Sequence, residues 1–115
     1  MATTPEGKVK AAIKKELERR GFWKAGGPRP EAVRGWFHMP VPNGMGVHGI
    51  PDFCCVWYGR PLFIEAKAPG GKPTENQLKR HTEIRAAGGI VLLISDVAEL
   101  VAFFEDTDSA SSKKA

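Results

Sequence analysis

The sequence predicts a single α/β domain whose mixed sheet is flanked by helices, in the order α-β-β-β-α-β-α. Three observations lead to this fold class. Near the N-terminus, apolar residues recur at helical spacing. Two short apolar runs are then separated by a tight turn. A capped helix, an aliphatic strand and a further helix follow. With 115 residues the chain is long enough for one modest core.

The first helix is expected to begin at Thr4-Pro5-Glu6. The threonine hydroxyl caps the helix, proline suits its first position, and the helix dipole favours an acid in the first turn. Gly21 ends a run of apolar residues at helical spacing: Val9, Ala12, Ile13 and Leu17. The outer face is basic and includes Lys8, Lys14 and Lys15. Simple solvation and phosphate contact explain that face equally well.

The middle of the chain predicts three strands. Residues 24–33 are expected to form a loop, and residues 34–41 a first strand that prolines stop. The glycine-rich segment 42–49 is interpreted as a flexible connection, because its spacing fits no phosphate-loop signature. Two apolar runs, 53–58 and 62–66, then form a hairpin around Tyr58-Gly59-Arg60-Pro61.

The C-terminal part predicts a helix, a strand and a helix. Thr74 and Gln77 have the spacing of a capping box, which opens a helix to about Ala87. Gly88-Gly89 closes it, residues 90–95 form a buried strand, and Asp96 caps the last helix. We expect one domain over residues 1–105 and a disordered polar tail over residues 106–115.

Composition and charge narrow the class of protein. Hydrophobic residues make up 42% and charged residues 26%, as in soluble globular proteins. No apolar run is long enough to cross a membrane and no signal-peptide core is visible, so we expect a cytoplasmic protein without a membrane partner. Cys54 and Cys55 are neighbours that point to opposite faces of a strand, which favours small core residues over a disulfide or metal site. The net charge of +4 favours a polyanionic partner, with nucleic acid first.

Charged residues at one end of the predicted hairpin suggest a site. If Gly59 and Arg60 are the two central turn residues, Lys67 lies opposite Asp52. Glu65 lies two places along and shares the face of Lys67. Direct and diagonal partners lie within roughly 5–8 Å, so two carboxylates and an ammonium group should converge. A turn of three residues would place Asp52 on the other face unless a bulge corrected it.

Two carboxylates this close repel, and a divalent cation removes that conflict. Oxygen ligands select hard ions, here Mg²⁺ or Mn²⁺, and the backbone carbonyl of Ala66 could add a ligand. Lys67 would orient an attacking water and stabilise negative charge in the transition state. Either carboxylate alone would more often belong to a structural ion pair; the combination favours a site.

These motifs resemble those of the PD-(D/E)xK nucleases, with Pro51-Asp52 as "PD" and Glu65-Ala66-Lys67 as "ExK". Their surroundings closely resemble the virus-type replication-repair nuclease (VRR-NUC) family, stand-alone phage type. The shared features are G-x-PD-hydrophobic, IE-x-K, Q-x-x-x-H on a helix, and G-G before a strand, over about residues 42–96. The resemblance implies a restriction-endonuclease-like fold.

The resemblance also implies roles for individual residues. Asp52, Glu65 and the Ala66 carbonyl would bind metal, Lys67 would be catalytic, and the family's helix glutamine falls on Gln77. Glu6 is the candidate for a first-helix glutamate that completes the metal site, although a first-turn acid favoured by the helix dipole is an equal explanation. Gln77 also fits as the capping-box partner. His81, one turn later, would contact phosphate or support the site, or be a satisfied helix histidine.

The expected function is Mg²⁺- or Mn²⁺-dependent hydrolysis of DNA phosphodiester bonds, selective for branched structures such as Holliday junctions. A homodimer would provide two sites for paired cuts. Phosphate contacts are expected from a set of basic residues, with His81 as an additional candidate: Lys8, Lys14, Lys15, Lys72, Lys79 and Arg80. The alternatives are a nicking, flap-type or restriction-like nuclease, or a non-catalytic DNA-binding module on the same fold.

Overall fold

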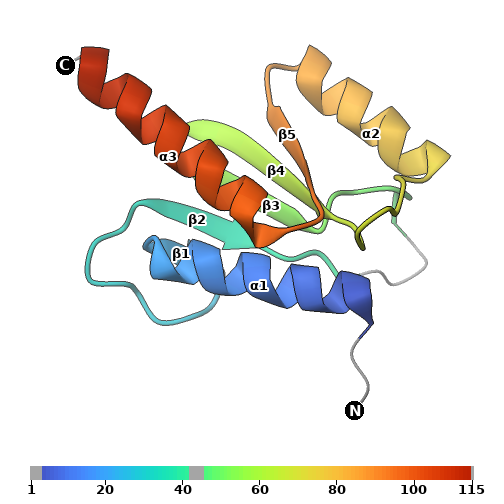
Figure 1. Ribbon diagram of the computed structural model, residues 1–115, viewed down its shortest axis with the longest axis horizontal. Helices are drawn as coiled ribbons and strands as arrows, with labels where there is room; N and C mark the ends of the chain where they lie inside the picture. The colour runs from blue at the N-terminus through green and yellow to red at the C-terminus, as the bar shows by residue number, and fades with distance from the viewer. Residues whose placement is uncertain (1–3, 42–45, 115) are drawn as a thin grey trace.

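The computed structural model describes residues 4–41 and 46–114, with side chains described up to Thr107. The predicted order of elements is confirmed, and the structure adds one short strand before the first predicted strand (Figure 1). The elements are α1 (Pro5–Arg19), β1 (Phe22–Lys24), β2 (Gly35–His38), β3 (Phe53–Trp57), β4 (Arg60–Ala66), α2 (Glu75–Ala86), β5 (Ile90–Ile94) and α3 (Val97–Lys114).

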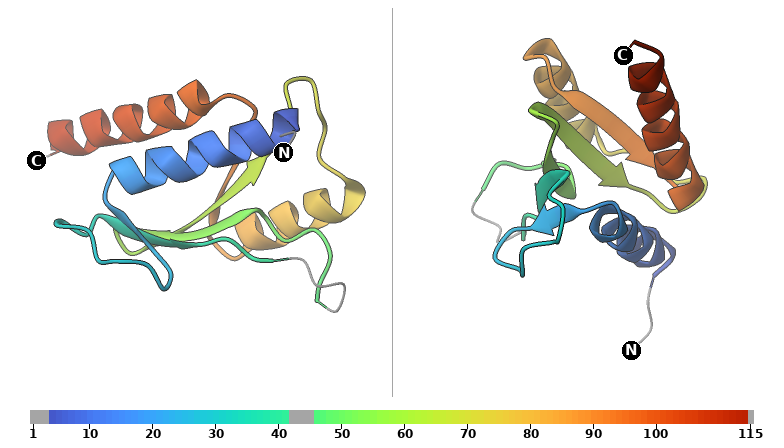
Figure 2. Two further views of the ribbon diagram at one scale, coloured as in Figure 1. Left: turned by 90° about the horizontal axis from the view of Figure 1, so that it is seen from below. Right: turned by 90° about the vertical axis from the view of Figure 1, so that its left-hand side faces the viewer.

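The five strands form one mixed sheet in the order β1-β2-β3-β4-β5. The central pairs β2–β3 and β3–β4 are antiparallel, while the outer pairs β1–β2 and β4–β5 are parallel. Helices α1 and α3 lie together on one face of this sheet, and α2 lies on the other face (Figure 2). The predicted mixed sheet flanked by helices is therefore confirmed.

The core fills the space between the sheet and the α1/α3 layer. Alternate residues of β3 and β4 point into it, which gives the in-out burial pattern of both strands. Its largest fully buried side chains include Ile13 and Leu17 of α1, Phe53 of β3, and Leu100 and Phe104 of α3. Burying each such side chain contributes about 1.5–3 kcal/mol. This core packing holds α1 against the sheet, with its N-terminal end near the start of β3 and the end of β4.

The three predicted helix starts are confirmed by their caps, and at α3 the Ala98 N–H donates to Asp96 Oδ1 at 2.9 Å. The Gly7 N–H donates to Thr4 Oγ1 at 3.0 Å, with Pro5 at the first helical position. In α2 the Gln77 N–H donates to Thr74 Oγ1 at 3.1 Å, and the Thr74 N–H donates to Gln77 Oε1 at 2.8 Å. Each cap satisfies amide groups that have no partner within the helix.

The hairpin turn differs from the predicted one by one residue. Its central residues are Tyr58 and Gly59, with φ of 49° and 74°, and Trp57 pairs with Arg60. Positive φ at both central residues is the requirement of the turn that matches the twist of a two-residue hairpin. The predicted turn at Gly59-Arg60 is wrong. The pairing moves by two residues, so Phe53 lies opposite Ile64 and every side chain keeps its predicted face.

The bounds of three other elements, β1, β2 and α3, also differ from the prediction. β1 lies between the predicted helix end at Gly21 and the predicted loop 24–33 and shares only Lys24 with that loop. It forms because Phe22 is buried in the core and the segment pairs with β2. β2 is shorter than the predicted strand 34–41, and residues 42–45 of the predicted glycine-rich connection lie outside the described residues. Helix α3 continues to Lys114, into the segment predicted as a tail; the division at residue 105 stays a prediction. In the part of the chain that the structure describes, no helix combines the length and apolar character needed to cross a membrane.

Candidate active site

The predicted charged residues meet where β3 begins and β4 ends. Asp52 directly precedes β3, Glu65 and Ala66 end β4, and Lys67 follows. The Ala66 N–H donates to Asp52 Oδ2 at 2.8 Å, which holds the carboxylate against β4. Continued by one step, the observed register places Asp52 opposite Glu65 instead of Lys67. The predicted convergence is thus present, although the predicted partner was wrong.

Glu65 is a buried carboxyl group with two side-chain partners. Its exposed fraction is 1%. Gln77 Nε2 donates to Oε2 at 3.0 Å, and His81 Nε2 lies 3.2 Å from Oε1. The pKa of Glu65 is raised to about 8, mainly by burial and then by the hydrogen bond and negative charge of Asp52, against the opposing charge of Lys67. Without a cation the site therefore favours a proton on Glu65 at neutral pH.

The N-terminal half of α1 supplies two more charged groups. Glu6 Oε1 lies 3.5 Å from Lys67 Nζ, and Lys10 Nζ lies 3.8 Å from Asp52 Oδ1. The Lys67 side chain is only 12% exposed. The backbone N–H of Lys67 donates to the Ile94 carbonyl at 2.9 Å. The sequence analysis missed Lys10. Its signal was the spacing of four residues from Glu6, which puts both side chains on one face of the helix.

Gln77 makes two contacts, one in the predicted capping box and one with a carboxyl of the candidate site. Its Oε1 accepts from the Thr74 N–H, and its Nε2 donates to Glu65. Because one end of the amide caps α2 and the other holds a site carboxyl, the start of α2 and the geometry of the site are tied together. A direct part in the reaction stays a prediction.

His81 does not lie where a phosphate contact requires. It is 3% exposed and faces Glu65 across the interface between α2 and the sheet. Burial lowers its pKa, and the nearby charges of Arg85 and Lys67 lower it further, so the imidazole is neutral at neutral pH. The predicted DNA contact by His81 is therefore corrected: its position supports the Glu65 carboxyl instead.

The segment before Asp52 packs closely on the first turn of α2. Gly49 has φ of 89°, and a Cβ atom there would lie 2.4 Å from the backbone carbon and oxygen of Asn76. Only glycine fits this approach. The adjoining cleft, about 570 Å³, is lined by Asp52 and Gln77 together with Lys10 of α1 and His48. The site is thus open beside Asp52, while Glu65 stays buried.

The predicted DNA-contacting cations differ in exposure and in partners. Four are exposed: Lys8, Lys15, Lys72 and Lys79. Three have intrahelical acid partners: Lys14 Nζ lies 3.0 Å from Glu18, Lys79 Nζ lies 4.0 Å from Glu75, and Arg80 Nε lies 2.9 Å from Glu83 in an ion pair that lacks hydrogen-bond alignment. These partners are exposed and weakly held, so their presence does not prevent phosphate contact.

The oxygen ligands at the site fit a hard cation whose coordination would be completed by the substrate. Among the described residues, no group of three or more His, Cys, Asp or Glu side chains is arranged to hold a metal ion. Asp52 and Glu65 offer two carboxylates, and Mg²⁺ is commonly held by one or two carboxylates with water and substrate phosphate. The N–H and C=O of one strand residue point to the same side, so the Ala66 carbonyl faces the side of Asp52.

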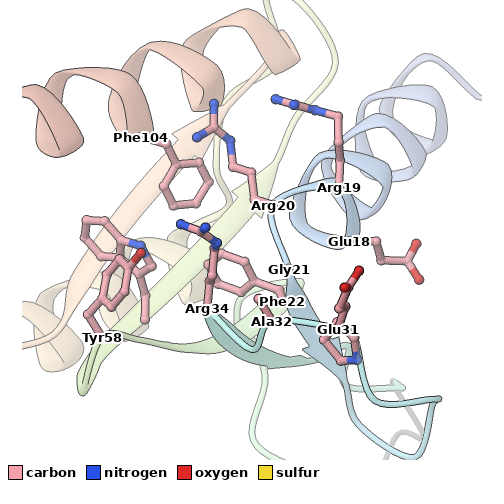
Figure 3. Close-up of a pocket in the computed structure, with 12 residues that line it drawn as sticks. Glu18, Arg19, Arg20, Gly21, Phe22, Glu31, Ala32, Arg34, Tyr58 and Phe104 are labelled. Atoms are coloured by element: carbon pink, nitrogen blue, oxygen red, sulfur yellow. The ribbon is translucent and has the colours of Figure 1, made fainter.

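A second cavity of about 500 Å³ lies at the opposite end of α1 (Figure 3). Its lining includes Arg19, Arg34, Tyr58 and Phe104, and none of the predicted site residues. β3 separates it from the carboxylates by roughly 17 Å. Arg19 Nη2 lies 2.7 Å from Glu16, and that hydrogen bond is the main cause of a lowered Glu16 pKa. The sequence analysis predicted nothing at this end.

Comparisons with known proteins agree with this arrangement. No family model matches the chain. A solved structure described as "VRR_NUC domain" is similar with a TM-score of 0.65 and 24% identity, over 90% of this chain and 97% of that chain. A curated relative, "Putative nuclease p44" of Acyrthosiphon pisum secondary endosymbiont phage 1, is 40% identical over 50 residues. That match spans 43% of this chain and about half, 54%, of the relative. The chain therefore has the VRR-NUC fold, and the predicted resemblance is confirmed at the level of the fold.

Proposed function

We propose that this chain is a member of the VRR-NUC family and hydrolyses phosphodiester bonds in DNA with Mg²⁺ or Mn²⁺. The observation that carries the proposal is the buried Glu65 carboxyl held beside Asp52, with a pKa raised to about 8. A protein that gained nothing from these charges would have little reason to keep them together. The name of the phage relative, a putative nuclease, points the same way.

The metal would be held by Asp52, Glu65 and the Ala66 carbonyl. When bound, it would supply Lewis-acid stabilisation of the phosphate and a water of lowered pKa. Gln77 and His81 keep the Glu65 carboxyl aimed at that position. These two residues act as positioning residues, because their contacts are with a ligand rather than with substrate.

Lys67 would assist the reaction itself. Its ammonium group would orient the attacking water and stabilise the negative charge that accumulates on the phosphate oxygens. A bond forms between the water oxygen and phosphorus, and the bond from phosphorus to the leaving sugar oxygen breaks. The proton that the water releases passes to solvent, and solvent protonates the leaving sugar oxygen. Glu6, 3.5 Å from Lys67 Nζ, holds the ammonium in place or supplies a further metal ligand.

Branched DNA is the proposed preferred substrate, cut by a homodimer in the cytoplasm of a host cell if the protein is phage-encoded. Exposed lysines on α1, on α2 and at residue 72 provide phosphate contacts, in a chain with net charge +4. Binding should therefore weaken steeply with salt. A two-fold dimer would present two sites to opposite strands of a junction.

Cleavage assays test the proposal. Supercoiled plasmid, linear duplex and a synthetic four-way junction are incubated with Mn²⁺ and wild-type protein, Asp52→Ala or Lys67→Ala, with the exposed acid variant Glu75→Gln as a control. The proposal expects cutting by wild type and Glu75→Gln alone. Binding without cutting by any form would favour the non-catalytic module. Equal cutting of linear duplex and junction would reject junction selectivity and keep the nuclease.

A further inference from the structure

One face of the sheet is only partly covered by a helix. α1 and α3 cover the face that carries the core, whereas α2 covers the other face beside β4 and β5 (Figure 2). In the part of the chain that the structure describes, no helix lies over β1, β2 and β3 on the α2 side. Trp36 there is 40% exposed and Val56, its partner on β3, is 47% exposed. Exposed apolar side chains that adjoin across strands form a contiguous patch, which is the kind of surface that proteins use for binding.

The strand register shows which side chains share this surface. Trp23 of β1 pairs with Trp36 of β2, and both alternate with the buried residues Phe22 and Phe37. His38 follows Trp36 on the same face, two residues along. We refer to Trp23, Trp36 and His38 as the aromatic strip.

The aromatic strip leads to the candidate active site. His38 pairs with Cys54, and Asp52 lies two residues before Cys54, on the same face. From the level of Trp36 to the level of Asp52 is four residues of β3, about 13 Å. Stacked nucleotides are about 3.4 Å apart, so the strip offers length for roughly four of them.

The chemistry of the strip matches unpaired nucleic acid. The rings of Trp36 and His38 are stacked at 6.4 Å between centroids with an interplanar angle of 27°. The Arg29 guanidinium lies 5.9 Å from the ring centroid of Trp23, which adds positive charge at the far end. Aromatic rings beside cations are the means by which proteins bind single strands through base stacking and phosphate contact.

We propose that the aromatic strip binds unpaired nucleotides next to the phosphate that is cut. This inference rests on the proposed function and deepens it: the substrate would carry a single-stranded segment that runs from Asp52 across β2 to β1. Fully paired DNA, a four-way junction included, would engage the lysines without engaging the strip. Among branched DNAs the inference therefore favours those with a single-stranded arm. Selectivity would then come from base stacking, which tolerates any sequence.

Binding without cleavage tests this inference. The full chain carrying Lys67→Ala is titrated in EDTA against a labelled duplex with a twelve-nucleotide single-stranded flank, and against a blunt duplex of equal charge. Trp36→Ala should weaken binding of the flanked duplex about tenfold and leave the blunt duplex within about twofold. Trp36→Phe should keep most of the affinity. Tyr58→Asn removes an aromatic side chain that is 61% exposed at the hairpin turn and should change neither.

Two further measurements make the result decisive. In the unsubstituted protein, photocrosslinking of bromodeoxyuridine in the flank should map to the peptide that contains Trp36, whether or not the variants fold. Sedimentation of Trp36→Ala should match that of the parent; conversion of a dimer to a monomer would overturn the inference and make the strip an interface between two copies. Equal loss on both DNAs, or no loss, would also overturn it. Flank binding by a chain that cuts no DNA would reject the nuclease and keep the strip, so the two failures are distinguishable.

Discussion

Replacing Glu65 by glutamine should change how the stability of the metal-free protein depends on pH. The carboxyl is 1% exposed and lies beside Asp52, which raises its pKa from 4.5 to about 8. Glutamine has nearly the same shape, so the contacts with Gln77 and His81 are largely kept, while the group that titrates is removed.

The sign follows from the direction of the shift. Between about pH 4.5 and 8 the folded protein keeps a proton that the unfolded chain has released, so the free energy of unfolding falls as pH rises. Each pH unit corresponds to about 1.4 kcal/mol, and the full shift to about 5 kcal/mol. For a domain of this size, a loss of about 1.4 kcal/mol per pH unit lowers the melting temperature by roughly 5 °C per pH unit. Glu65→Gln should lack this decline.

The assay is thermal and urea unfolding in EDTA from about pH 5 to 8, with the exposed acid variant Glu75→Gln as the matched control. Wild type and Glu75→Gln should lose stability in parallel above about pH 6.5, while Glu65→Gln stays nearly constant there. Below about pH 6.5 the lowered pKa of His81 works in the opposite direction in all three proteins, so the comparison between them is the readout. Adding Mg²⁺ at pH 8 should restore the stability of the wild-type protein, because a ligand that binds only the folded state stabilises that state. Parallel profiles for wild type and Glu65→Gln would refute the reasoning.

Three other substitutions test particular contacts. Gly49→Ala should destabilise the protein and abolish cleavage, because the added Cβ would meet the backbone of α2. Gly70→Ala is the control: it also has positive φ but open space around it, and should lower the free energy of unfolding in urea by only about 1–2 kcal/mol. Equal losses in the two variants would contradict the close packing at Gly49. Thr74→Ala should lower stability by about 1 kcal/mol through loss of the α2 cap, and an unchanged urea midpoint would speak against that cap. Lys10→Ala should lower kcat/KM for DNA about tenfold, as expected when a positive charge beside Asp52 is lost, while Arg60→Ala, at the hairpin end far from the site, should change it less than twofold; a reversed ranking would remove Lys10 from the site.

Much of the fold was predictable because its signals are local. Thr4, Thr74 and the glycines that end α1 and α2 act within a few residues of their own position, and the structure confirms these helix limits. The gathering of Asp52 and Glu65 was also predictable, because a hairpin brings its two ends together whatever its exact turn. The error of one residue in the turn left every side chain on its predicted face of the sheet, because it moved the strand pairing by two residues.

The rest depended on contacts that sequence spacing does not record. β1 has three residues, too few for a periodic pattern, and it forms because Phe22 is buried against the core. The sequence left three explanations open for His81, namely a phosphate contact, a group that supports the site and a satisfied helix histidine. Only the packing of α2 on the sheet shows that it faces Glu65. The exposure of Trp36 follows from the absence of a helix over its strand, which the sequence of β2 itself does not indicate.

The most direct test is to locate manganese in a crystal of the full chain, using anomalous scattering at the manganese edge. The proposal predicts a peak about 2.1 Å from carboxylate oxygens of Asp52 and Glu65, with the Ala66 carbonyl as a further ligand. The peak should be absent in Asp52→Asn. Manganese bound elsewhere in the molecule, with none between these two carboxylates, would contradict the account.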